Sequence, residues 1–120
     1  MATIYAPPKE VGNPPQFEPG GDFRKRMKDE EAWVAELAAW AKQNGNGSEA
    51  GEEIRFPVGD GYARYIVLSM RPVKLIHIPT FDAYSFQYAN RLTAADIREK
   101  IRSARAMRKL FSSKPLEATA

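Results

Sequence analysis

The chain of 120 residues contains no cysteine, and this absence excludes several classes of function. Without a thiol there is no disulfide, no thiolate nucleophile and no zinc site built on cysteine. Histidine is almost as scarce, because His77 is the single example. Since no second histidine is present and the acidic residues are scattered, the sequence predicts neither a metal site nor a cofactor.

Long apolar runs are also missing. No run approaches the roughly 20 residues that span a bilayer, and the first residues lack the pattern of a secretory signal. Gly59–Asp60–Gly61 fits a hairpin turn, because it carries neither the Lys-Ser/Thr of a P-loop nor a dinucleotide fingerprint. We therefore expect a soluble, cytoplasmic protein that binds neither membranes nor a small-molecule substrate.

The lone histidine is a weak candidate for catalysis. A general base needs a substrate proton within reach and usually an orienting group behind it. His77 lies in the apolar stretch VKLIHIP. Asp60, Asp82 and Ser69 could supply an acid or a hydroxyl, but nothing in the spacing requires it. We interpret His77 as structural and predict no enzymatic activity, while a hydrolase or transferase that uses His77 stays open.

Proline and glycine are concentrated near the N-terminus. Because proline fixes φ and disfavours helix in the preceding residue, residues 1–21 should form an extended Pro-rich arm. This arm is either a disordered tail or a segment that packs on a neighbour through Ile4, Tyr5 and Phe17.

Hydrophobic periodicity predicts a first helix after the arm. Apolar residues recur at helical spacing from Phe23 to Ala41, after a possible N-cap at Asp22 and before a stop at Asn44–Gly45. The cations that follow Phe23 oppose the helix dipole, so the regular helix should begin nearer residue 29. Residues 44–53 are predicted to form a flexible loop.

The middle of the chain predicts β-structure. Ile54–Val58, Tyr62–Met70 and Val73–Pro79 alternate or are apolar throughout, and Tyr84–Tyr88 is a possible fourth strand. The expected fold class is α+β: a single domain at residues 22–114, with a small antiparallel meander of three to four strands. We expect both helices on one face of the meander and a short tail at 115–120.

The segment LTAADIREKIRSARAMRKLF is the most clearly predicted helix. Thr93 followed by Asp96 forms a capping box. An apolar stripe at spacings of three and four predicts its packing face: Ile97, Ile101, Ala104, Met107 and Phe111.

Positive charge is concentrated in this same segment. Residues 1–90 hold 10 Lys+Arg against 12 Asp+Glu, whereas residues 91–114 hold 8 against 2. On a helical wheel, four cations lie within about 60° of one another beside the apolar stripe. We call these four residues the basic band: Arg98, Arg102, Arg105 and Lys109.

The basic band has two interpretations. Like charges at these spacings destabilise a helix by about 0.2–0.5 kcal/mol per pair, so the arrangement needs an explanation. Acidic partners from elsewhere in the fold could neutralise a solvated face, or the band could bind an external polyanion or an acidic protein surface. Arg91, Tyr84 and Tyr88 are the next candidates for partner contacts, since aromatic side chains beside cations can stack bases, although a half-buried strand shows the same pattern.

Two resemblances bear on function. The order helix, strands, helix over about residues 23–111 is similar to the double-stranded-RNA-binding domain, which grips phosphates with bases at the start of its last helix. Here TAAD stands at that place and the bases begin a turn later. Residues 59–98, with a GDG-Tyr hairpin, a meander, an aromatic loop and a terminal helix, resemble small accessory proteins of tailed bacteriophages.

The sequence thus predicts a non-enzymatic binding protein whose basic band engages nucleic acid or an acidic protein surface. The phage resemblance implies an accessory or virion protein, located in the host cytoplasm or the virion. The alternative is a structural or assembly protein that forms a homo-oligomer, with its Pro-rich arm and Trp-bearing helix in contact with neighbouring subunits.

Overall fold

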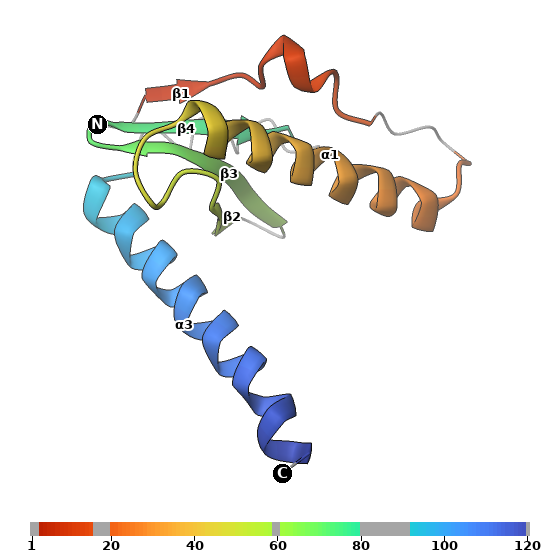
Figure 1. The fold of residues 1–120 in the computed structure, drawn as a ribbon. Helices are drawn as coiled ribbons and strands as arrows, with labels where there is room; N and C mark the ends of the chain where they lie inside the picture. The colour runs from red at the N-terminus through yellow and green to blue at the C-terminus, as the bar shows by residue number, and fades with distance from the viewer. Residues whose placement is uncertain (1–2, 16–19, 59–60, 80–91, 120) are drawn as a thin grey trace.

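A four-stranded sheet with a helix on each face forms the fold (Figure 1). The computed structural model describes residues 3–15, 20–58, 61–79 and 92–119. The elements in chain order are β1 (Thr3–Tyr5), the 3-10 turn η1 (Lys9–Val11), α1 (Phe23–Asn44), β2 (Glu53–Val58), β3 (Gly61–Met70), β4 (Val73–Ile78) and α3 (Ala94–Thr119). The predicted α+β class is confirmed, and the three strands of the meander lie within one or two residues of their predicted bounds.

The sheet is mixed, with strand order β1-β4-β3-β2. β2, β3 and β4 pair antiparallel as predicted, but β1 adds to β4 in parallel, with Ile4 opposite Leu75. The expectation of a purely antiparallel sheet was therefore wrong. The N-terminal arm supplies the fourth described strand because it pairs with the edge of β4 and packs Ile4 on the core. The alternative fourth strand, Tyr84–Tyr88, lies outside the described residues.

The two helices cover opposite faces of the sheet, which corrects the prediction of one shared face. Tyr65 and Val67 of β3 pack with Ile97 and Ile101 of α3, whereas Ile66 between them packs with Leu37 of α1. Successive side chains of a strand point to opposite faces, so a strand that is apolar on both sides needs a cover on both.

α1 begins at Phe23 and not near residue 29. The Asp22 side chain accepts a hydrogen bond of 3.0 Å from the Arg24 backbone N–H, as predicted for an N-cap. This cap satisfies a helix-end donor, and solvent screens the exposed cations that follow it. The first turns extend beyond the sheet, so Phe23 and Met27 stay 66% and 47% exposed.

The N-terminal arm also contacts α1. The Trp33 indole N–H donates a 3.2 Å hydrogen bond to the Gly12 carbonyl, and Val11 packs against the apolar cluster beneath α1. Gly12 has a φ of 80°, in the region that favours glycine. The arm therefore uses these groups within its own chain.

Residues 44–53, predicted to be a flexible loop, are bonded to the end of β3. Asn46 N–H donates to Leu68 O at 2.9 Å, Gly51 N–H to Val67 O at 2.8 Å and Val67 N–H to Glu52 O at 2.9 Å. Ala50 is buried in the same region. These bonds extend the β2–β3 ladder and fix the position of Glu52.

Candidate polyanion-binding surface

α3 begins with the predicted capping box. Thr93 N–H donates to Asp96 Oδ2 and Asp96 N–H donates to Thr93 Oγ1, both at 3.1 Å. The hydrogen bonds from the Thr93 backbone and hydroxyl lower the pKa of Asp96 below its usual value. Leu92 is buried beside this cap, so the first turn of α3 is held both by its cap and by the core.

The apolar stripe of α3 leaves the sheet after two turns. Ile97 and Ile101 are buried, at 0% and 4% exposure, but Met107 is 51% exposed. Figure 1 shows the C-terminal part of α3 running away from the sheet. The prediction that the whole stripe packs is therefore wrong at Met107, while the Phe111 side chain lies outside the described residues. The sheet is too short to cover a 26-residue helix, about 39 Å long.

Within the basic band, Arg98 and Arg102 are exposed to solvent. Arg98 has no ion pair among the described residues. Arg102 lies 3.4 Å from Glu99, and both side chains are more than half exposed, so the pair contributes little. Lys109 is exposed as well.

Arg105, the remaining member of the basic band, contacts an acid from the loop between α1 and β2. Arg105 Nε lies 3.0 Å from Glu52 Oε1 and its Nη2 donates to Ser48 O at 2.9 Å. Arg108, which was not assigned to the band, lies 2.6 Å from Glu52 Oε2. Partial burial would raise the pKa of Glu52, but the hydrogen bonds and charges of Arg108 and Arg105 lower it below its usual value. We call this group the Glu52 clamp (Glu52, Arg105 and Arg108).

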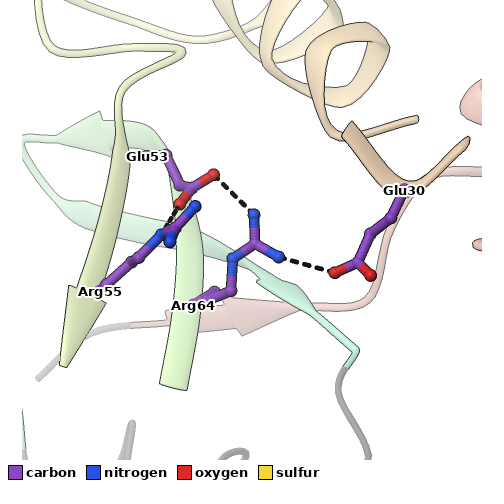
Figure 2. Close-up of polar contacts among 4 residues, drawn as sticks. All are labelled: Glu30, Glu53, Arg55 and Arg64. Atoms are coloured by element: carbon purple, nitrogen blue, oxygen red, sulfur yellow. Dashed lines mark hydrogen bonds and ion pairs between the residues drawn. The ribbon is translucent and has the colours of Figure 1, made fainter. Parts of the chain in front are cut away.

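A second ion-pair cluster ties α1 to the sheet on the opposite face. Arg64 of β3 reaches Glu30 of α1 at 2.7 Å and Glu53 of β2 at 2.9 Å, and Glu53 also pairs with Arg55 (Figure 2). Burial would raise the pKa of Glu53, but hydrogen bonds from Arg55 and Arg64 and their charges lower it. This cluster holds helix and strands together and is already charge-balanced, so it offers no free cation for a ligand.

The structure also places the other predicted residues. His77 is half-buried in β4, 5.7 Å from the Tyr65 ring between centroids, and burial lowers its pKa. The candidates Tyr84, Tyr88 and Arg91 lie outside the described residues. In the part of the chain that the structure describes, no three His, Asp or Glu side chains gather as a metal site would need. Nor does any described helix combine the length and apolar content that crossing a membrane requires.

The sequence analysis missed a second basic surface at the start of α1. Arg24, Lys25 and Lys28 are exposed there, around the half-exposed Phe23 and Met27. The signal was present as the run RKRMK. It was overlooked because the regular helix was expected to begin after it, so these cations were not placed on a helix surface.

Comparisons with known proteins identify no relative. No family model, no curated protein and no solved structure matches the chain.

Proposed function

We propose that the chain is a non-enzymatic binding protein whose basic band engages the phosphate backbone of a nucleic acid. The observation that carries this proposal is the position of Arg98 and Arg102, two exposed guanidinium groups on the flank of a helix that leaves the sheet. Lys109 extends the same flank toward the C-terminus.

The spacing of the cations along α3 suits the phosphate backbone of a nucleic acid more than a small ligand. The cations repeat along about 16 Å of helix from Arg98 to Lys109, at 1.5 Å per residue. Guanidinium groups bind phosphate oxygens in a bidentate way, and each phosphate that is neutralised releases a counterion. The like-charge repulsion in α3, which costs stability in the free chain, is relieved when an anion binds.

The resemblance to phage accessory proteins fits a binding role, in the host cytoplasm or in the virion. The assembly alternative receives less support, because β1 and the Trp33–Gly12 bond use the arm and the Trp-bearing helix within one chain. A protein with an acidic surface is the other partner that the charge would suit, and the experiment below separates it from nucleic acid.

The test compares two triple variants with equal loss of charge. Neutralising the band with R98Q/R102Q/K109Q should weaken binding to labelled duplex and single-stranded oligonucleotides at least tenfold in fluorescence anisotropy. The slope of log K against log salt should fall by about 2.7 on duplex DNA, at 0.9 per lost phosphate contact. The control K9Q/K42Q/R71Q removes three exposed cations that lie on other elements.

Equal weakening by the two variants would mean that binding follows net charge, and the band would not be a site. Failure of the unaltered chain to bind any oligonucleotide would refute the proposal. If the chain then captured an acidic protein through the same three residues after nuclease treatment, the alternative partner would replace it.

A further inference from the structure

A groove runs between the edge strand β2 and α3. It encloses about 570 Å³, and Ile54 of β2 together with Ala104 and Met107 of α3 supplies its apolar lining. Arg55, Lys100 and Arg108 border it, and Lys100 also lies 5.4 Å above the Phe56 ring. The groove is separate from the basic band, which lies on the other flank of α3.

Among the described residues, no strand pairs with the outer backbone edge of β2 along this groove. Val67 N–H donates to Glu52 O, so hydrogen-bonded pairs continue at Ile54 and Phe56, and the backbone groups of Glu53 and Arg55 point away from β3. β2 is the last strand of the described sheet on this side. Pro57 has no N–H, so any added strand pairs mainly at Glu53 and Arg55.

Short strand pairing needs further apolar burial to be stable, and α3 provides it. Met107 lines the groove and is 51% exposed, on a part of α3 that the sheet does not reach. A helix segment without a packed face is marginal in water, because most helical stability in proteins comes from packing.

The charge pattern of β2 favours one partner for the groove, namely a second copy of β2. When two β2 strands pair antiparallel about a two-fold axis at Ile54, Glu53 of each lies opposite Arg55 of the other. In the single chain Glu53 already pairs with its own Arg55 and with Arg64, so the dimer adds to or exchanges the Arg55 pair across the axis. Opposite charges across strands stabilise a pair, whereas like charges in that position destabilise it. The same axis brings both Met107 side chains to one interface, since Met107 lies in the groove beside Ile54.

We infer that this surface is the contact between two copies of the chain, which join their sheets edge to edge through β2 and pack α3 against α3. The interface is isologous, so the sheet continues across the two-fold axis and assembly stops at the dimer. It also covers one strand edge of the described sheet, which would otherwise be open to aggregation.

The test measures mass in the absence of nucleic acid, by sedimentation velocity from low to high micromolar concentration. The unaltered chain should sediment as a dimer. Met107→Glu places a charge in the apolar contact, and Arg55→Glu places an acid opposite Glu53. Each should weaken dimerisation at least tenfold. Met107 is exposed in the single chain, so Met107→Glu should leave a folded monomer. Arg55→Glu also removes the pair with Glu53 of its own chain, so circular dichroism checks that this variant stays folded.

The matched control is Met27→Glu, the same change on α1 at a methionine that is 47% exposed. This variant should remain dimeric. In addition, Met107→Cys introduces the single thiol of the chain and should give a covalent dimer with a short bismaleimide crosslinker, whereas Met27→Cys should not.

A monomer at all concentrations would overturn the inference, as would a dimer that Met107→Glu and Arg55→Glu leave intact. Because no nucleic acid is present, this failure is distinguishable from failure of the proposed function.

Discussion

At the scale of single residues, Glu52 connects the loop after α1 to α3. Its carboxylate accepts from Arg105 and Arg108, while its carbonyl accepts from Val67 N–H. The backbone bond fixes where the carboxylate stands. One side chain thereby pairs with two of the cations that the sequence gathers in α3. This contact supports the interpretation in which acids come from elsewhere in the fold for that part of the helix.

We predict that Glu52→Gln lowers the free energy of unfolding by about 1 kcal/mol at neutral pH, because both arginines are exposed enough for solvent to screen the pair. The folded-state pKa of Glu52 lies below its usual 4.5. Ionised Glu52 therefore stabilises the fold above about pH 4.5, and this contribution is lost as pH falls through the lowered pKa.

The measurement is urea unfolding at pH 7 and at steps from pH 5 to pH 3. The difference between the unaltered chain and Glu52→Gln should shrink as the pH falls. Glu36→Gln, at an exposed position of α1 without a described ion pair, should show no such trend. A difference that is constant over this range would mean that the Glu52 clamp contributes nothing through its charge.

At the scale of elements, each helix packs over only part of its length. α1 buries Trp33, Val34 and Leu37 but exposes Met27, and α3 buries Ile97 but exposes Met107. The apolar stripe of each helix therefore continues beyond the sheet, in the N-terminal half of α1 and in the C-terminal half of α3.

Because α3 extends beyond the sheet, replacing an apolar side chain by alanine should lower the free energy of unfolding by different amounts at its two ends. Ile97→Ala should lower the free energy of unfolding by about 2–5 kcal/mol, because Ile97 is fully buried between α3 and β3. Met107→Ala should cost under about 0.5 kcal/mol in the monomer, as expected for an exposed position. The comparison is made at concentrations low enough to exclude dimer. Similar losses at both positions would show that α3 packs along its whole length.

The helix caps and the strands could be predicted from the sequence, but the face of the sheet that each helix covers could not. The caps at Asp22 and Thr93 and the strands of the meander depend on neighbours in the chain, so their patterns were recognised. Amphipathic periodicity predicts which side of a helix is buried, but it does not predict the face of the sheet against which that side packs. The positions of α1 and α3 therefore could not be predicted. The apolar run at Tyr65–Leu68 contained the signal, because a strand buried on both faces requires two covering layers.

The same limit applies to the candidate surface. Clustering of cations in α3 was visible in the sequence, whereas the pairing of Arg105 with Glu52 joins residues 53 positions apart. Contacts of that range follow from the fold and have no local signature. The strand β1 was missed for a related reason, since three residues are too few for a recognisable pattern.

At the scale of the whole molecule, the N-terminal arm supplies β1, the edge strand of the sheet on the side opposite β2. β1 pairs with β4, Ile4 packs on the core beneath α3, and Gly12 accepts from Trp33 on the other face. The arm thus contacts both layers of the fold. This arrangement makes the arm part of the folded domain, in contrast to a tail or a clamp on a neighbouring subunit.

We predict that deletion of residues 1–12 destabilises the single chain. The loss should exceed about 2 kcal/mol, because the backbone bonds of β1 contribute about 1 kcal/mol each and the apolar contacts of Ile4 and Val11 are lost as well. Denaturant unfolding at low micromolar concentration measures this loss. Trp33→Phe removes the bond to Gly12 and also part of a buried ring, so this variant should itself cost at least about 1 kcal/mol. The arm and the groove lie at opposite edges of the sheet, so the deletion should leave dimerisation through β2 unchanged. If the deletion instead abolished self-association while the free energy of unfolding stayed constant, the arm would act on a neighbouring subunit, as the assembly alternative requires.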